Sequence, residues 1–379
     1  MSLINYVTKI QFGYDSLAHL AAEAERAGIT RALIVTDLGV RNAGIVDKVI
    51  AALGANRPYT IFDATPPNPN EHAVREAVAL YRQGECDGII AVGGGSSIDL
   101  AKGVAVCATH NGPLQSFAVI EGGLERITSA TAPLIAIPTT AGTGSEVGRG
   151  AILILDDGRK VGVISPYVVP RVAICDPELT LGLPPMLTAA TGMDAIAHCI
   201  ETFMAPAFNP AADGIALDGL WRAWSHIERA TAEPGDRQAR LNMMSASMQG
   251  ALAFQKGLGC VHSLSHALGG INPKLHHGTL NAIFLPAVVH FNADSPTVRD
   301  EQKLERLRHA MGLAADANIG SAIEAMTRRL GLPTRLSEIG VDESLFEHII
   351  EGALHDHSHK TNPREASSAD YLTMLRQSL

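Results

Sequence analysis

Helical and strand-like segments alternate along the first half of this chain. A segment with helical periodicity, residues 16–27, ends at Gly28 and is followed directly by the β-rich run RALIVT, residues 31–36. The same order recurs twice, in the pairs 46–53 with 59–63 and 70–84 with 88–95. This alternation predicts a parallel sheet with crossover helices, a fold class in which ligands bind at the carboxyl ends of the strands.

Two loops rich in glycine and hydroxyl groups follow predicted strands. GGGSSID, residues 93–99, opens a helix, so its small residues let backbone N–H groups approach a phosphate at the helix N-terminus. PTTAGTGSE, residues 138–146, offers many donors to a ribose, a phosphate or a nicotinamide amide. The first loop lacks the GxGxxG fingerprint, and an N-capped helix after a glycine turn is its alternative interpretation. Together the two loops favour a nucleotide site.

Two charged residues near the strand ends are further candidates for that site. Asp37 follows the first strand, where a carboxylate could bind the ribose hydroxyls of NAD and repel the 2′-phosphate of NADP. It precedes the glycines instead of following them, so the analogy is only chemical, and a helix cap or turn is the alternative. Lys160 begins the second strand of a hairpin predicted for residues 151–165, where a solvated lysine is the more ordinary interpretation.

Proline residues bound the segment PELTLGLPP, residues 177–185, and the strand signal fades beyond it. We therefore expect an α/β domain over residues 1–182 and an all-helical domain over residues 183–379. Helical patterns in the second part cover 188–203, 213–230, 236–254, 301–311, 317–330 and 368–379.

The helical part contains two pairs of metal-binding side chains at helical spacing. Asp194 and His198 are four residues apart, as are His262 and His266, so each pair lies on one helix face. A carboxylate with two or three imidazoles suits a borderline divalent metal such as Fe²⁺ or Zn²⁺, with an open position for a substrate. The alternatives are a hydrogen-bonded core pair for Asp194 and chance spacing for the histidines, of which the chain has 15.

Composition excludes several other classes of function. The formal net charge is -9 and no basic stripe is present, so nucleic-acid binding is not expected. The longest apolar runs have the length of strands, which argues against a membrane span. The N-terminal stretch, residues 1–13, has no apolar signal region, and the five cysteines form no CxxC pair, so we expect a cytoplasmic protein with reduced thiols.

Five motifs in one order resemble the iron-containing (group III) alcohol dehydrogenase family. They are GGGSSID, PTTAGTGSE, TAATGMDAIAHCIE, VHSLSHALGG and HHGTLNA, spread over residues 93–282. The resemblance implies an α/β N-terminal dinucleotide-binding domain and an all-α C-terminal domain, the fold shared with dehydroquinate synthase. It also implies a metal-dependent, NAD-linked dehydrogenase of small alcohols and aldehydes that forms homodimers or larger assemblies.

Site residues follow from the resemblance, motif by motif. It implies four metal ligands, Asp194, His198, His262 and His277, and a proton-relay role for His266. His277 is chosen because it directly precedes Gly278, while the neighbouring His276 is the alternative, since the spacing here is one residue longer than in many members. For the nucleotide, the resemblance implies Asp37, Gly94, Gly95, Ser96, Asp99, Thr139, Thr140 and Lys160, which outweighs the solvated-lysine interpretation.

Within the family, three long runs are similar to the 4-hydroxybutyrate dehydrogenase branch, at residues 201–224, 239–266 and 359–367. A substrate carboxylate would need a cation or a donor cluster, for which Arg149, Lys256 and the segment His355–Lys360 are candidates. A general short-chain alcohol or diol dehydrogenase is the nearer alternative. A lyase like dehydroquinate synthase, which uses NAD and a metal without net redox change, is the more distant one.

Overall fold

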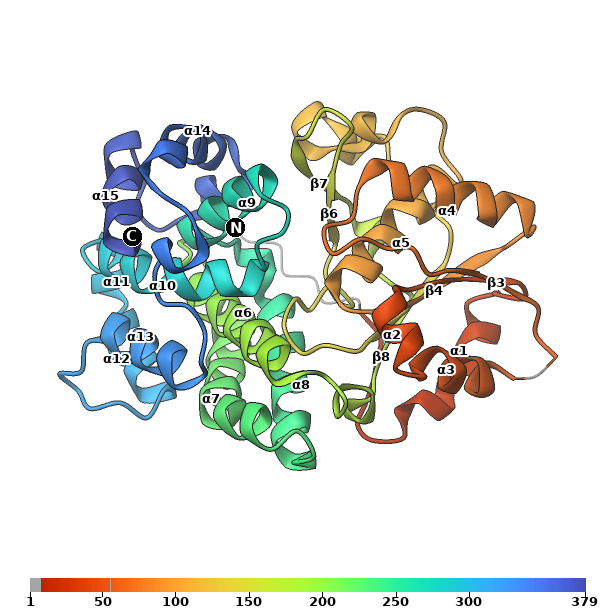
Figure 1. Ribbon diagram of the computed structural model, residues 1–379, viewed down its shortest axis with the longest axis horizontal. Coiled ribbons are helices and arrows are strands. Elements are labelled where there is room, and N and C mark those ends of the chain that lie inside the picture. The colour runs from red at the N-terminus through yellow and green to blue at the C-terminus, as the bar shows by residue number, and fades with distance from the viewer. Residues whose placement is uncertain (1–7, 55) are drawn as a thin grey trace. The chain divides into compact units, whose positions relative to one another are not determined.

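The computed structural model describes residues 8–54 and 56–379 and contains two compact units (Figure 1). The α/β unit comprises Gly144–Gly182 and the described residues up to Thr140. The helical unit comprises Leu183–Leu379 together with the short segment Ala141–Thr143. Residues 1–7, part of the stretch in which no signal sequence is expected, lie outside the described residues.

A parallel sheet forms the centre of the α/β unit, as the alternating pattern predicts. Its strand order is β1-β8-β5-β4-β2-β3, and every neighbouring pair is parallel. The strands are β1 (Ile10–Phe12), β2 (Ala32–Val35), β3 (Tyr59–Phe62), β4 (Gly88–Gly93), β5 (Leu134–Pro138) and β8 (Val172–Cys175). The residues of β2, β4, β5 and β8 are all buried, because the sheet lies between two apolar clusters. Because β4 and β5 are parallel neighbours, the loops that follow them begin side by side at the same edge of the sheet.

The helices of this unit begin where side chains can cap them. The Asn70 side chain accepts the Ala73 N–H at the start of α4 (Glu71–Gln83), and Gly94 precedes α5 (Gly95–Cys107). The expected helix over residues 16–27 starts with a 3-10 turn, Ser16–His19, before α1 (Leu20–Arg26). The remaining elements are α2 (Leu38–Asn42), α3 (Ile45–Leu53) and the predicted hairpin, β6 (Gly150–Ile154) with β7 (Lys160–Ile164).

The long helix α6 (Pro185–Met204) packs against α7, α8 and α10 in the helical unit. It begins three residues before the expected Thr188, because Pro185 suits the first helical position and needs no N–H partner there. Thr188 instead accepts a hydrogen bond from the buried Arg240. The other helices are α7 (Pro210–Ala232), α8 (Arg237–Leu252), α9 (Cys260–Ile271), α10 (His277–Asn292), α11 (Pro296–Asp300), α12 (Lys303–Ala310), α13 (Ile319–Arg329), α14 (Phe346–His355) and α15 (Ser368–Ser378).

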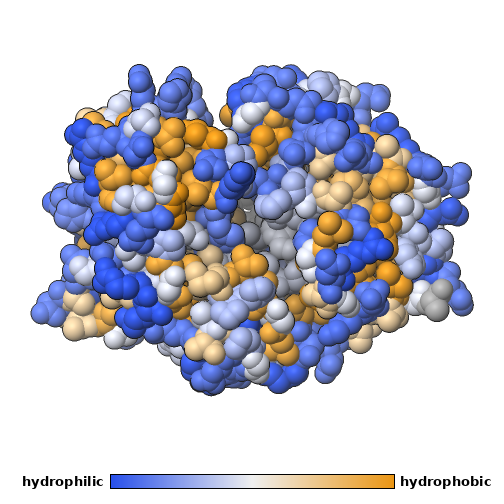
Figure 2. Space-filling model, in the orientation of Figure 1, coloured by the Kyte–Doolittle hydropathy of each residue, from blue (hydrophilic) through white to orange (hydrophobic). Residues whose placement is uncertain are grey.

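Hydrophilic residues make up much of the face shown in Figure 2, with hydrophobic patches between them. Large apolar side chains that are exposed include Phe208, Leu38 and Ile120. Among the described residues, none of the helices has both the length and the apolar character that crossing a membrane requires.

Candidate metal centre

Three histidine side chains of the helical unit converge on one carboxylate oxygen, that of Asp194. Asp194 and His198 lie on α6, His262 lies on α9, and His277 is the first residue of α10. The Nε2 atoms of the three histidines are 3.5, 3.8 and 3.6 Å from Oδ1 of Asp194. Ligand atoms at about 2.1 Å from a tetrahedral metal lie about 3.4 Å from one another. The spacing therefore suits a single ion held by these four residues.

A glycine allows the third helix to approach this centre. A Cβ atom on Gly278 would lie only 2.1 Å from the carbonyl oxygen of Ala190 on α6, and 3.3 Å from the Cβ of Asp194. Any side chain at this position would push the start of α10 away from α6. A glycine is therefore required after His277 for steric reasons, because it lets α10 approach α6 and brings His277 beside Asp194.

Asn281 is a member of the cluster that the sequence did not suggest. Its Nδ2 atom donates to Oδ1 of Asp194 at 2.7 Å and lies 3.2 and 3.1 Å from Nε2 of His262 and His277. Its own Oδ1 is buried and has no hydrogen-bond partner among the described residues. The NH₂ group of Asn281 thus contacts the same Asp194 oxygen and histidine nitrogens that a cation would bind. The signal available was its position four residues after His277, which places both on one face of α10.

The protonation states of these four residues favour binding of a cation. Burial raises the pKa of Asp194, but the neighbouring His198 and His277 outweigh it and hold that pKa well below its usual range. Burial lowers the pKa of His198 to about 4, so its imidazole is neutral and offers a lone pair. Burial also lowers the pKa of His262, but hydrogen bonds to Asp194 and Glu201 raise it to about 9. Binding a metal would release that proton and satisfy the same carboxylate, so the donor set fits a divalent ion.

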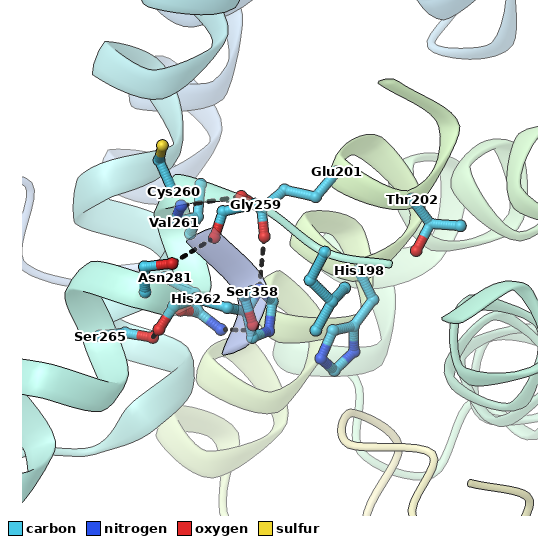
Figure 3. Close-up of polar contacts among 12 residues, drawn as sticks. His198, Glu201, Thr202, Gly259, Cys260, Val261, His262, Ser265, Asn281 and Ser358 are labelled. Carbon is cyan, nitrogen blue, oxygen red and sulfur yellow. Dashed lines mark hydrogen bonds and ion pairs between the residues drawn. The ribbon is translucent and has the colours of Figure 1, made fainter. Parts of the chain in front are cut away.

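Glu201 is a second residue that sequence reasoning missed, and Figure 3 shows its contacts with α9. This buried carboxylate accepts the Val261 N–H at 2.8 Å through Oε1 and a hydrogen bond from Nδ1 of His262 at 2.5 Å through Oε2. A proton fixed on Nδ1 leaves Nε2 of His262 to face Asp194 as a ligand atom. Glu201 lies three residues after His198, on the same side of α6, which was the only sequence signal for it.

The loop after β5 supplies an outer partner for His198. Nδ1 of His198 is 3.3 Å from the carbonyl oxygen of Gly142, which belongs with the helical unit. A Cβ atom on Gly142 would lie 2.6 Å from the backbone oxygen of Thr191, so the loop also needs a glycine to pass this close to α6. Part of PTTAGTGSE therefore orients a ligand candidate, a role that the sequence did not suggest.

His266, the relay candidate, lies beside the ligand candidates and binds a different carboxylate. Its Nδ1 is 3.0 Å from Oδ2 of Asp356, and its ring stacks on that of His277 with centroids 5.3 Å apart. Burial raises the pKa of Asp356, but His266 and His357 lower it well below its usual range. His266, Asp356 and His357 form a second group with spacing that could hold a metal.

The two adjacent histidines before Gly278 lie in different surroundings. His277 joins the cluster around Asp194, whereas His276 is exposed and precedes α10. His276 lines a cavity of about 310 Å³ with residues that include Met186 and Lys274.

In the α/β unit, the two glycine-rich loops meet at the ends of β4 and β5. The Thr139 N–H donates to the carbonyl of Gly93, and a Cβ atom on Gly94 would lie 3.2 Å from the Thr140 side chain. Gly93 has a φ of 152°, and a side chain there would collide with Ser97. Gly95 begins α5, so backbone N–H groups of a helix N-terminus lie in this cradle of small residues.

Asp37 has the capping role that was the alternative interpretation for it. Its side chain accepts the Val40 N–H at 3.0 Å at the start of α2, and it accepts a hydrogen bond from Ser97 at 3.2 Å. The Asp37 carboxylate lies close to Gly93, since a Cβ atom on that glycine would be 3.4 Å from one of its oxygens. Asp37 thus lies beside the phosphate-binding cradle candidate while it caps a helix.

Three other nucleotide candidates have partners inside the α/β unit. Asp99 accepts the Ser145 hydroxyl at 2.5 Å and the Ile152 N–H at 2.9 Å, so its oxygens tie α5 to the second loop and to β6. Lys160 donates to the Asn68 side chain at 3.1 Å. Ser96 donates to the carbonyl of Pro67. For Asp99, the bonds indicate a structural role in addition to the one implied by resemblance.

Two family models match this chain from near its start to its end. The description "Iron-containing alcohol dehydrogenase" covers residues 7–177, and "Fe-containing alcohol dehydrogenase family, C-terminal" covers residues 188–379. Together they span both units.

Similar proteins cover the whole chain. It is 62% identical to 4-hydroxybutyrate dehydrogenase of Cupriavidus necator, over 100% of both chains. The solved structure of a 1,3-propanediol oxidoreductase matches with a TM-score of 0.93 and 34% identity, over 100% of both chains. That of sulfoacetaldehyde reductase from Bifidobacterium kashiwanohense in complex with NAD⁺ matches with a TM-score of 0.88 and 27% identity, over 100% of this chain and 99% of that one.

Replacing each of the adjacent histidines separately tests the ligand set. His277→Ala should weaken metal binding by at least about 100-fold, because loss of a ligand should exceed the 10–100-fold effect of losing an outer partner. His276→Ala, in which an exposed neighbour is removed, should stay within about twofold of the original affinity. Competition with a chromophoric chelator measures both dissociation constants for Zn²⁺. The reverse ranking would contradict the assignment of His277.

Glu201→Gln tests whether an outer carboxylate sets the metal affinity. An amide has only one acceptor oxygen and no charge, so it cannot accept both hydrogen bonds from α9. We therefore expect a loss of about 10–100-fold in Zn²⁺ affinity, with the helical content retained. Thr202→Val is the matched control, because it removes a partly buried hydrogen bond from the same helix to Gly257 and leaves the bond between Glu201 and His262 in place. Equal affinities of the two variants would argue that Glu201 has no orienting role.

Proposed function

The chain belongs to the iron-containing alcohol dehydrogenase family, and we propose that it oxidises 4-hydroxybutyrate to succinate semialdehyde and catalyses the reverse reduction. Its reaction class follows from membership: it is an oxidoreductase of CH–OH groups that uses NAD and a divalent metal. The observation that supports the substrate is the identity of 62% to a 4-hydroxybutyrate dehydrogenase over the full length of both chains, against 34% to a 1,3-propanediol oxidoreductase.

The cluster around Asp194 would hold the metal. Asp194, His198, His262 and His277 supply one carboxylate oxygen and three Nε2 atoms, a set that suits Fe²⁺ and Zn²⁺ alike. A divalent metal supplies Lewis acidity, which lowers the pKa of an alcohol hydroxyl. Glu201 keeps the Nδ1 proton of His262 in place, so that the ring presents its lone pair to the ion.

His266 would accept the proton that the alcohol loses. With Nδ1 as the donor to Asp356, its Nε2 atom carries the lone pair, which is the tautomer that a general base needs. The Asp356 carboxylate then stabilises the imidazolium that forms, because it is ionised and lies 3.0 Å from Nδ1. His266 is buried, which limits the contact of its ring with bulk water.

NAD would bind in the α/β unit and accept the hydride. The cradle of Gly94 and Gly95 would bind the pyrophosphate at the start of α5, with Ser96, Thr139, Thr140 and Lys160 as further donors. Asp37, beside the cradle, would bind the ribose hydroxyls and disfavour the 2′-phosphate of NADP. Asp99 would support this site by holding the loop that contains Ser145.

We also propose a homodimer or larger homo-oligomer in the cytoplasm. Exposed apolar side chains such as Phe208 and Trp221 are surfaces that another copy could cover, and the family resemblance implies assembly. All five cysteines are free and four of them are buried, which fits a reducing compartment. Analytical ultracentrifugation of the purified chain would measure the assembly directly.

A general short-chain alcohol or diol dehydrogenase remains the second candidate, because a 1,3-propanediol oxidoreductase matches the chain over its full length. The two candidates differ in whether the site recognises a carboxylate.

A substrate panel tests the proposed function. The metal-loaded chain with NAD should produce NADH absorbance with 4-hydroxybutyrate, at a kcat/KM at least about 10-fold above that for 1-butanol or 1,3-propanediol, since a charge-assisted hydrogen bond contributes that much. A chelator should abolish the rate and added Zn²⁺ or Fe²⁺ should restore it. Rapid oxidation of the diol with no reaction of 4-hydroxybutyrate would rule out the substrate and leave the reaction class intact.

A further inference from the structure

We propose that His357 recognises the carboxylate of the substrate by donating its ring N–H to it. The proposal rests on the proposed function, because it requires a substrate that carries a carboxylate at the end away from the reacting hydroxyl. The candidates for such a group were Arg149, Lys256 and the segment His355–Lys360, and their surroundings in the structure differ sharply.

Lys256 is engaged inside the helical unit. Its side chain is only 1% exposed and forms an ion pair with Asp213, and its ammonium also donates to the carbonyl of Phe203 at 3.2 Å. A buried cation with an anionic partner cannot leave that partner without a large cost. Lys256 therefore has a structural role, while Arg149 is exposed and belongs to the α/β unit.

Within the segment His355–Lys360, most donors are used elsewhere or lie in solvent. Nδ1 of His355 is 2.8 Å from the carbonyl of Glu351, at the end of α14. Nδ1 of His359 is 2.9 Å from the hydroxyl of Tyr371. Lys360 is exposed. The Ser358 hydroxyl is buried, and of the three histidines in this segment only His357 has a ring contact with His266 among the described residues.

His357 stands at the outer end of a row of stacked imidazoles. Its ring lies 5.7 Å from that of His266 at an interplanar angle of 22°, and the His266 ring lies 5.3 Å from that of His277 at 14°. The row leads from the metal-ligand candidate, through the relay candidate, to His357. About a third of the His357 side chain is exposed (32%), against 10% for His266, so a ligand can reach it.

Asp356 lies beside this ring and organises the turn that contains it. Its carboxylate accepts the Ser358 N–H at 2.8 Å and so caps the short 3-10 helix that begins at His357. The same carboxylate binds His266 and lies 3.6 Å from Nδ1 of His357. One anion thus binds His266 directly and lies next to His357.

The other nitrogen of His357 is available for a ligand. Its Nε2 makes no hydrogen bond with any residue in the described ranges 8–54 and 56–379. A carboxylate that approaches this part of the site meets the negative charge of Asp356, so it needs a donor in between. An N–H from His357 supplies that donor.

The length of the substrate matches one step of the row, from His266 to His357. A four-carbon hydroxy acid separates its hydroxyl from its carboxylate by about 5 Å when extended. This span is close to one step between neighbouring rings, 5.3 or 5.7 Å. A substrate whose hydroxyl lies beside His266, the proton acceptor, would therefore bring its carboxylate close to His357, which is one step further along the row.

The test compares 4-hydroxybutyrate with 1-butanol, an alcohol of the same length without the charge. His357→Ala should lower kcat/KM for 4-hydroxybutyrate by about 10–100-fold and change that for 1-butanol by less than about threefold, because only the acid loses a charge-assisted hydrogen bond. His357→Gln, which keeps an N–H donor, should recover part of the loss. His357→Glu should lower the rate with the acid further, since like charges repel.

Controls separate the possible failures. His348→Ala, which removes an exposed histidine from α14, should leave the ratio of the two substrates unchanged. Equal losses for both substrates in His357→Ala would overturn the proposal in favour of a structural role. A fall in the ratio with Arg149→Ala but not with His357→Ala would assign recognition to Arg149 instead. If the unmodified enzyme itself does not prefer 4-hydroxybutyrate to 1-butanol, the proposed substrate fails, and the role of His357 fails with it.

Discussion

The helical unit is organised around the buried charge of Asp194. This side chain is 3% exposed, and a carboxylate in such surroundings needs compensating partners from every side. Three helices provide them: α6 supplies His198, α9 supplies His262, and α10 supplies His277 and the amide of Asn281. The close approach that this requires explains Gly278, where any side chain would collide with α6. Packing, charge and ligand geometry therefore depend on the same few contacts.

A second feature is shared by three of the histidines. Each binds an oxygen through Nδ1: His198 contacts the carbonyl of Gly142, His262 contacts Glu201, and His266 contacts Asp356. A proton held on Nδ1 leaves Nε2 as the lone-pair atom, which is the requirement of a metal ligand and of a base. The outer oxygens thus decide what each ring can do, and they come from a loop, a helix and a 3-10 turn that are far apart in the sequence.

The sequence predicted the features that depend on local periodicity. Alternating segments gave the parallel sheet, and spacing by four placed Asp194 with His198 and His262 with His266. It did not reveal Glu201 and Asn281, because a polar residue at a helical offset from a ligand is equally common on a solvated face, and only packing decides. The bonds of Asp99 to Ser145 and Ile152 were hidden for the same reason, since they join segments about 50 residues apart. The helical pattern places the start of α6 at Thr188 and not at Pro185, because a proline indicates a boundary as readily as a first helical residue.

We expect one metal ion to bind at Asp194 and the three Nε2 atoms, the contacts around which the helical unit is organised. Anomalous diffraction from crystals of the chain grown with Zn²⁺ tests it most directly, because the signal locates the ion independently of activity. A single strong peak should lie about 2.0–2.2 Å from the Asp194 oxygen and from Nε2 of His198, His262 and His277. A peak at the second group, His266 with Asp356 and His357, and none at Asp194 would contradict it.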